Sequence, residues 1–516
     1  TFAIDAVVPV LGDHEDKSVS GGKTYSNKAP GLTFAAIPLY ALLRIALPAP
    51  ASAAAPILWV LRVLTVTVLC VVALARLARR LAAGPVPEAA PLVVAAVAFG
   101  TPYLFFARSF FSHAWTAALL FLSWDAIVAG EDAGRKDAGE DAARRGRRRT
   151  LLVALAGLLA GWAVISEYEV ALVAGLLALR AALGPGGRRI LKLVAFAAGA
   201  AIPLAKLLYY DWVCFGSPWV LSSAREAFPM YSRLARTGFF GFHTPSPRIA
   251  VHYLFHPARG LLLFSPFLIW AIPGFLRWWK SSGGEGAGGD DGRGRGLGTS
   301  RADCVFALAS TVLFFVLMCG YPNWHGGWSL GDRYLVPVLF FPALALPYAL
   351  VSPRSRGLFG AAVVLSAATH LLLTASWTYF PDNVPWPAAT ASAWFLARGW
   401  TAASLLDVFP GGGWAAIALT WFAVAACLIL ALRRADAGAS RPAPALIALL
   451  GLFPLVMLVW SAPPLAFDAR LWRGAIFGAY SGRDPQRLEL RAVAESAVTP
   501  QEQRMAIGAW RAYGPR

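Results

Sequence analysis

A segment in the second half of the chain combines polar and aromatic side chains that could bind a phosphorylated sugar. It runs from Tyr321 to Tyr334 as YPNWHGGWSLGDRY. The guanidinium of Arg333 can hold a phosphate through two parallel hydrogen bonds. The rings of Trp324 and Trp328 offer flat faces to a sugar. We therefore predict that this segment contacts a sugar phosphate.

The same segment contains His325 and an ionisable pair, Asp332 and Arg333, that opens directly into an apolar run. Such a pair at the mouth of a membrane helix is costly unless it faces a cavity or a partner. We include His325, Asp332 and Tyr334 among the predicted substrate-binding residues. For Asp332, an ion pair with Arg333 that only closes a glycine-rich turn remains an alternative.

A lysine near the start of the chain is a second candidate phosphate ligand. Lys28 lies in YSNKAPG, immediately before the apolar segment 31–48, and Asp5 and Asp16 precede it. A lysine at the N-terminal end of a helix favours an anion, because the helix presents unpaired N–H groups there. A lysine that only reaches lipid headgroups would have the same sequence signature.

Two short turns between apolar runs supply further candidates. Glu167 and Glu169 flank Tyr168 in one turn, and His113 ends the other. Turns this short hold their residues near the membrane surface. We predict Glu167 as a catalytic carboxylate and His113 as a substrate contact, while a hydrogen-bonded interfacial histidine is the simpler alternative for His113.

Histidines and cysteines give no metal signature. Three histidines share the loop 210–258, but their spacing matches no zinc pattern. The five cysteines are scattered and lie mostly within apolar runs. The sequence therefore predicts no metal site and no certain cofactor, and leaves a divalent cation open.

Membrane helices must position these residues. Hydrophobic residues make up 58% of the chain and charged residues 14%. Runs of about 20 apolar residues cross a bilayer core, and about a dozen such runs follow one another between residues 56 and 461. They are continuous rather than alternating, which favours helices over a barrel. We predict an all-α polytopic membrane protein.

The net charge of +18 follows a membrane topology rather than a nucleic-acid surface. Basic residues gather in every second loop, as cytoplasmic loops require. We therefore expect no nucleic-acid partner and place the loops 210–258, 321–333 and 377–413 on the non-cytoplasmic face. The cytoplasmic loops 131–149 and 281–301 have the composition of flexible linkers.

The chain divides into three parts. Residues 1–55 form a first outer loop whose apolar segment is expected to lie in the membrane interface. Residues 56–461 form the transmembrane bundle, and residues 462–516 form an outer tail. A polar N-terminus does not reach the outer face without a preceding span or signal, so we expect one more transmembrane helix before Thr1.

Several short motifs occur in an order that resembles a known family. They are YSNKAPG with PLY, FSHAW, EY, FGSP, GLLLFSPFL and WHGGWSLGDRYLVP. Together they resemble the bacterial polyprenyl-phosphate-dependent glycosyltransferases of the GT-C superfamily. The resemblance is greatest to the family-39-like members, relatives of protein O-mannosyltransferases and the lipid A aminoarabinose transferase. It extends from the first residues to about Leu350.

This resemblance implies a GT-C-like bundle of about 12 transmembrane helices, or about 13 with the upstream one. It implies an enzyme of the bacterial inner membrane with its active site on the periplasmic face. Such enzymes move a sugar from a polyprenyl monophosphate to a lipid, glycan or protein acceptor. Membrane lipids and these two substrates are thus the expected partners.

The resemblance also suggests roles for individual residues. It implies that Lys28 binds the donor phosphate, and the chemistry of Arg333 makes it a second ligand. The family's acidic pair follows its first transmembrane helix and would lie upstream of Thr1. Asp5, Asp16 and Glu167 are therefore the remaining candidates for a catalytic carboxylate.

Two other functions remain open. A flippase or transporter for a lipid-linked glycan should carry charges within its spans, whereas here only Asp125 and Lys206 lie near span ends. An O-antigen-ligase-like enzyme would use a diphosphate-linked donor and arginines of a large outer loop. The loop 210–258 holds several arginines, which keeps this second alternative open.

Overall fold

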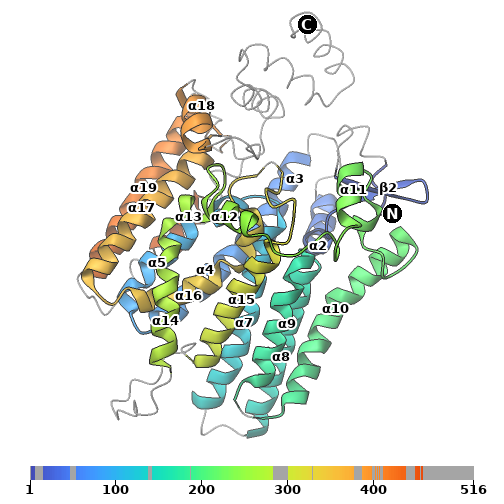
Figure 1. Ribbon diagram of the computed structural model, residues 1–516, viewed down its shortest axis with the longest axis horizontal. Helices are drawn as coiled ribbons and strands as arrows, with labels where there is room; N and C mark the ends of the chain where they lie inside the picture. The colour runs from blue at the N-terminus through green and yellow to red at the C-terminus, as the bar shows by residue number, and fades with distance from the viewer. Residues whose placement is uncertain are drawn as a thin grey trace, which may run out of the picture.

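The computed structural model describes most of the chain, and the described residues form a bundle of helices with one small hairpin (Figure 1). These residues are 2–5, 16–46, 54–136, 142–185, 187–282, 300–327, 329–376, 386–397, 401–402, 404, 406, 411–436, 448–453 and 455–456. The predicted outer tail and part of the predicted loop 377–413 lie outside them.

The first half of the chain supplies one side of the bundle. Its helices are α2 (Gly31–Ala46), α3 (Ala54–Leu61), α4 (Val68–Ala82), α5 (Ala90–Phe99), α6 (Tyr103–Phe106), α7 (Ser112–Lys136), α8 (Ala142–Val164), α9 (Ala171–Leu183) and α10 (Arg189–Phe215). A π-helical segment, Arg62–Thr67, joins α3 to α4 into one rod.

The second half adds shorter helices and three more long ones. They are α11 (Pro229–Ala235), α12 (Pro247–Phe255), α13 (Leu261–Phe264), α14 (Ala271–Ser281), α15 (Arg301–Met318), α16 (Phe340–Ala349), α17 (Pro353–Ala375), α18 (Ala393–Ala397) and α19 (Gly412–Asp436). In Figure 1, α17 and α19 stand together on the left, and α10 forms the opposite side.

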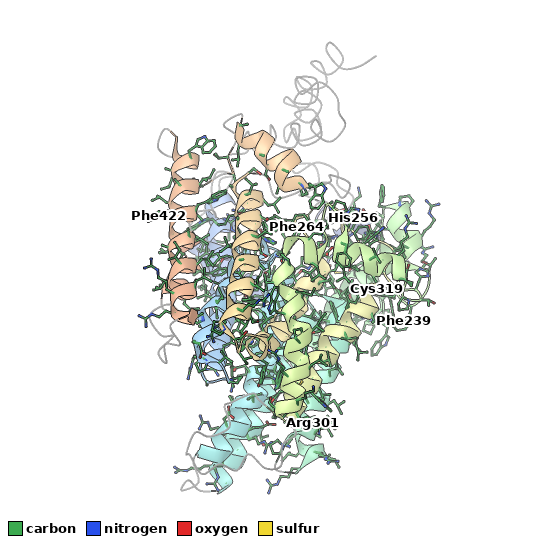
Figure 2. The ribbon with its side chains drawn as sticks, turned by 60° about the vertical axis from the view of Figure 1, so that its left-hand side comes forward. Phe239, His256, Phe264, Arg301, Cys319 and Phe422 are labelled. Atoms are coloured by element: carbon green, nitrogen blue, oxygen red, sulfur yellow. The ribbon has the colours of Figure 1, made fainter. Side chains whose placement is uncertain are left out.

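Five helical stretches of the described structure are long and apolar enough to cross a membrane. They are Ile57–Ala82, Arg189–Phe215, Arg301–Met318, Pro353–Ala375 and Gly412–Ala435. Several helices also expose large apolar side chains, such as Phe422 on α19, which points away from the bundle (Figure 2). The predicted class, an all-α polytopic membrane protein, is confirmed.

Small residues let α8 and α10 approach closely. A Cβ atom on Gly157 would lie 1.9 Å from the carbonyl oxygen of Phe196, and one on Gly199 would lie 1.9 Å from that of Ala154. Lipid tails are as apolar as leucine, so helices in a membrane associate through such close packing rather than through burial of apolar surface. These glycines therefore fix where the two helices cross.

The two ends of the bundle differ in their polar structure. A two-stranded antiparallel hairpin, β1 (Lys17–Ser20) and β2 (Lys23–Ser26), lies at one end together with α11 and α12 (Figure 1). We call this the hairpin end. Arg301 lies at the opposite end of α15 from Cys319, as Figure 2 shows.

Buried ion pairs join α4 to α7 near the opposite end. The guanidinium of Arg80 donates to the Asp125 carboxylate at 2.5 Å and to the Asp132 carboxylate at 2.8 Å. Arg76 contacts the second Asp125 oxygen at 2.6 Å. Because both acids are on α7, these contacts fix the rotation of α7 against α4.

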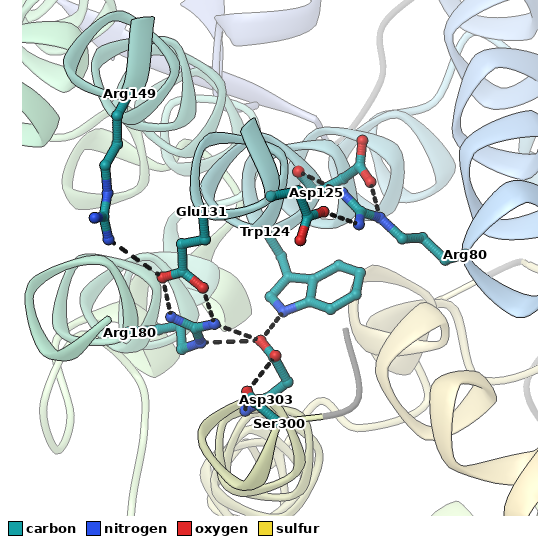
Figure 3. A network of polar contacts seen from close by, with 9 residues as sticks. Arg80, Trp124, Asp125, Glu131, Arg149, Arg180, Ser300 and Asp303 are labelled. Carbon is teal, nitrogen blue, oxygen red and sulfur yellow. Dashed lines mark hydrogen bonds and ion pairs between the residues drawn. The ribbon is translucent and has the colours of Figure 1, made fainter. Parts of the chain in front are cut away.

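A second set of buried pairs joins α7, α9 and α15 (Figure 3). Arg180 donates to both oxygens of Glu131, at 2.8 and 2.9 Å, and to Asp303 at 2.9 Å. The indole N–H of Trp124 donates to the same Asp303 oxygen at 2.9 Å. One guanidinium thus joins two carboxylates from two other helices.

The prediction that residues 131–149 form a flexible linker is wrong for the residues that the structure describes there, 131–136 and 142–149, which are helical. Helix α7 continues to Lys136 and α8 begins at Ala142. Glu131 is buried and Arg149 approaches it to 3.8 Å. The segment has the composition of a linker because it is rich in charged residues. Its acids pair with arginines of other helices, which the local sequence does not show.

We expect Arg180→Ala to destabilise the bundle by about 3–5 kcal/mol, because it leaves the buried Glu131 and Asp303 without their shared cation. The exposed Arg144 on α8 is the matched control, and Arg144→Ala should change the free energy of unfolding by less than about 0.5 kcal/mol. Thermal unfolding in detergent measures both. Equal melting temperatures for the two variants would contradict a structural role for the network.

Candidate functional site

The first residue of α2 is seated against the turn between α8 and α9. The Gly31 N–H donates to the Ile165 carbonyl at 2.8 Å, and the Trp162 indole donates to the Gly31 carbonyl at 2.9 Å. A Cβ atom on Gly31 would lie 2.3 Å from Ser166 Oγ. Only glycine allows this approach, which places the segment containing Lys28 beside the turn.

Lys28 forms an exposed ion pair with Asp16. Its Nζ lies 2.6 Å from Asp16 Oδ1, with both side chains more than half exposed. Burial raises the pKa of Asp16, but Lys28 and Arg333 lower it more, so the net shift is downward. The carboxylate is therefore ionised at neutral pH. Exposed pairs of this kind are weak, so an incoming anion can displace Asp16 from Lys28.

The guanidinium of Arg333 lies in the same electrostatic environment. Its Nη2 donates to Tyr334 Oη at 3.2 Å, while Nε has no hydrogen-bond partner among the described residues. Burial lowers the pKa of Arg333, but Tyr334, Glu167 and Asp16 raise it above its usual value. A charged guanidinium is suited to bind phosphate oxygens.

A glycine makes room for this guanidinium. A Cβ atom on Gly326 would lie 2.6 Å from Arg333 Nε, and the backbone of Gly326 has a φ of +67°. Both the space and the backbone conformation exclude larger residues there. The glycine-rich sequence of the segment thus sets the orientation of Arg333.

Glu167 is buried in the turn between α8 and α9 and contacts the start of α7. Its Oε1 lies 2.9 Å from His113 Nδ1 and also accepts a hydrogen bond from the Ser112 hydroxyl. The His113 ring packs edge-on to that of Tyr334, with centroids 6.2 Å apart. Lys28 and Arg333 are both close enough to act electrostatically on His113.

Glu169 is a further carboxyl group of the site that the predicted set did not include. Burial raises its pKa well above the usual value, and the charge of Glu167 and a hydrogen bond to it raise it further. Glu167 precedes the 3-10 helix Tyr168–Val170, which contains Glu169. Glu169 therefore stays protonated to a higher pH than an exposed glutamate does. The sequence Glu167-Tyr168-Glu169 was the signal that could have identified Glu169 as part of the site.

Glu226 is a second residue that the sequence did not reveal. Its Oε2 accepts a hydrogen bond from Asn27 Nδ2 at 2.6 Å, and its charge interacts with Lys28 and Asp16. Burial raises its pKa. Because Glu226 belongs to the long loop after α10, it anchors that loop beside the hairpin.

Arg259 holds the predicted segment 321–334 in place. This buried guanidinium donates to the Ser329 hydroxyl at 2.7 Å, to the Gly327 carbonyl at 2.6 Å and to the His325 carbonyl. The Trp324 ring packs between those of His252 and His256, at centroid distances of 4.8 and 5.0 Å.

Asp332 is buried behind the same segment. Burial raises its pKa well above the usual value, although the Arg259 charge and the Leu261 backbone N–H lower it. No ion pair joins Asp332 to Arg333, both of which the structure describes, so the turn is not closed by that pair. Asp332 therefore lies behind the segment and is not the ion-pair partner of Arg333.

The structure brings together six of the predicted site residues at the hairpin end. They are Asp16, Lys28, His113, Glu167, Arg333 and Tyr334.

Other predicted residues lie elsewhere or outside the described structure. Asp5 accepts a hydrogen bond from the Thr24 N–H at 2.9 Å and holds the N-terminal segment to the hairpin. The His325 ring accepts from the Gly327 N–H at 3.2 Å within its own turn. Trp328 lies outside the described residues. In the described part of the chain, no three His, Cys, Asp or Glu side chains gather as metal ligands would.

Comparisons with known proteins give one likeness of structure. No protein family and no curated protein sequence matches the chain. The fold is similar to the crystal structure of ArnT from Cupriavidus metallidurans bound to undecaprenyl phosphate. The identity is 16% and the TM-score 0.49, over 92% of this chain and 74% of that chain. A likeness at this level assigns no function to the chain.

We expect Gly31→Ala to destabilise the protein by about 1–3 kcal/mol, because its Cβ would overlap Ser166 and Ile165. Gly175→Ala is the matched control, since a Cβ at that position on α9 meets nothing within 4 Å. The control should be neutral or stabilising by up to about 1 kcal/mol. Apparent melting temperatures distinguish the two, and equal values would contradict the seat at Gly31.

The Glu167–Glu169 pair predicts a pH-dependent stability. The folded protein keeps a proton on Glu169 that the unfolded chain releases above its ordinary pKa of about 4.5. Stability therefore falls as pH rises from that value toward the raised pKa. Gln at position 169 cannot ionise, so Glu169→Gln should lose less of its melting temperature between about pH 6 and pH 8 than the wild type. Equal losses would show that Glu169 is not held protonated.

Proposed function

We propose that the chain is a membrane glycosyltransferase that takes a sugar from a polyprenyl-phosphate donor on the periplasmic face. One observation carries this proposal. Lys28 and Arg333 are far apart in the sequence. Both are close enough to the carboxylate of Asp16, at the hairpin end, for their charges to lower its pKa. The order of the sequence motifs, which resembles that of GT-C enzymes, supports the same function.

Two cations at one site suit the leaving group of such a reaction. As the bond between the sugar and the phosphate breaks, negative charge grows on the phosphate oxygens. Fixed positive charges that face this position lower the energy of the transition state. Lys28 exchanges Asp16 for the phosphate, and the guanidinium of Arg333 donates to a second oxygen. Polyprenyl phosphate then leaves as the second product.

Glu167 is the best-placed carboxylate to act as general base. Ser112 and His113 hold its Oε1. In this proposal Glu167 takes the proton of the acceptor hydroxyl while that oxygen bonds to the anomeric carbon. The acceptor is a lipid, a glycan or a protein with a free hydroxyl or amine.

The paired charges at the opposite end argue against the flippase alternative. A transport path for a charged lipid head would need ionisable groups available along the bundle. Arg80 and Arg180 are buried, and each is held by two carboxylates. Their charges are used to join helices.

We expect Lys28→Ala and Arg333→Ala each to lower turnover by about 100-fold or more, because each removes a charge from the phosphate. Lys23→Ala, on the exposed tip of the same hairpin, should stay within about twofold of the wild type, as surface substitutions usually do. The assay supplies radiolabelled polyprenyl-phosphate sugars and a membrane-lipid extract to full-length protein in nanodiscs and follows released polyprenyl phosphate.

The outcomes of this assay are distinct. Release from one sugar donor, with loss in both site variants, supports the transferase. Full turnover in both variants would show that Lys28 and Arg333 do not bind the donor phosphate. If no donor releases polyprenyl phosphate and the protein flips a labelled lipid in liposomes, the protein is a transporter and the transferase proposal is wrong.

A further inference from the structure

The long loop between α10 and α12 carries an unusual charge for its place in the chain. Residues 216–258 contain four arginines, Arg225, Arg233, Arg236 and Arg248, against one acid, Glu226. Loops on the non-cytoplasmic face normally have few arginines. Glu226 is already bonded to Asn27. The loop therefore has a net charge of +3, four arginines less one glutamate, which favours contact with an anionic surface.

A tight turn of this loop presents two exposed phenylalanines. Phe239 is 76% exposed and Phe240 60% exposed. The Phe239 N–H donates to the Phe242 carbonyl at 2.9 Å, and the Phe242 N–H donates back to the Phe239 carbonyl at 3.0 Å. Phe240 has a φ of +52°, which is unusual for a phenylalanine. The backbone thus accepts strain at the position where an aromatic ring is turned outward.

The base of this turn is fixed to the end of a membrane-spanning helix. The His243 N–H donates to the Gly320 carbonyl at 2.7 Å, and the Ser246 N–H donates to the Cys319 carbonyl at 3.0 Å. The Phe242 ring packs on that of Tyr321, with centroids 5.2 Å apart. Since α15 ends at Met318, the turn lies where this span meets the membrane surface. Figure 2 shows Phe239 beside Cys319, pointing away from the bundle.

Basic side chains stand next to these rings. Arg233 lies in the last turn of α11, and Arg236 caps that helix one residue before Thr237. Both arginines are exposed. An aromatic tip with arginines directly behind it matches the two layers of a membrane surface, the acyl boundary and the phosphates of the headgroups.

We propose that residues 233–242 form a membrane-inserting finger. Phe239 and Phe240 enter the bilayer surface, and Arg233 and Arg236 bind the phosphates of anionic phospholipids. This contact fixes the loop that carries Glu226, and thereby the hairpin with Lys28, at a constant depth relative to the membrane. The proposal concerns lipid contact and does not depend on the transferase reaction.

Spin labels at defined sites test the depth of the finger. Phe239→Cys and, as the matched control, Lys23→Cys at the hairpin tip are each labelled in a Cys427→Ser background and placed in phosphatidylcholine nanodiscs. The other four native cysteines are buried. The label at position 239 should be more accessible to oxygen than to a water-soluble nickel chelate, and the label at position 23 should show the reverse. A water-exposed label at position 239 would overturn the proposal.

The headgroup contact has its own test. Adding phosphatidylglycerol to the nanodiscs should lower the chelate accessibility at position 239 at least twofold, and Arg233→Gln with Arg236→Gln should abolish this change. An unchanged response in the double variant would overturn the role of the arginines. Spin–spin broadening between labels at position 239 would show that the finger meets a second copy of the chain, and would also overturn the lipid contact.

Discussion

The contact between Gly31 and the turn after α8 is the interaction on which the candidate site depends. It is made by two backbone hydrogen-bonding groups and allows no side chain at position 31. Backbone groups away from water need partners, and this contact supplies them for the start of α2. Without it, the segment of Lys28 would be held by the hairpin and by the contacts of Asn27 with Glu226 and Ser222, none of which reaches the turn that carries Glu167. The contact of Gly31 has no catalytic role itself, but it positions Lys28 relative to Glu167 and Arg333.

The two ends of the bundle use charge in opposite ways. Away from the hairpin, Arg80 and Arg180 are buried, and each contacts two carboxylates. These ion pairs join helices. At the hairpin end, the described residues give Lys28 one carboxylate partner, the exposed Asp16, and place no carboxylate in an ion pair with Arg333. Charges that are incompletely paired are available to a ligand, whereas fully paired ones are not. This difference is the reason for proposing the site at the hairpin end.

The sequence predicts part of the fold and of the candidate site, whereas the remaining contacts depend on how the helices pack. Apolar runs gave the all-α membrane fold, and Lys28, Glu167 and Arg333 were identifiable because ionisable groups beside such runs are costly. Hydropathy could not show which faces of the helices meet. All ten residues of α5 are buried, so its sequence has no polar face to indicate its orientation. The bond between Asn27 and Glu226 spans 199 residues and left no local signal. The acids that pair with Arg80 and Arg180 lie on other helices, which is why residues 131–149 were mistaken for a linker.

The most direct test is a cryo-electron microscopy structure of the full-length protein in nanodiscs with polyprenyl phosphate. The account predicts phosphate density between Lys28 Nζ and the Arg333 guanidinium, with Asp16 displaced from Lys28. It also predicts that Arg80 and Arg180 keep their carboxylate partners when the lipid is bound. Phosphate density at the Arg180 end of the bundle, or an intact Lys28–Asp16 pair beside a bound lipid, would contradict it.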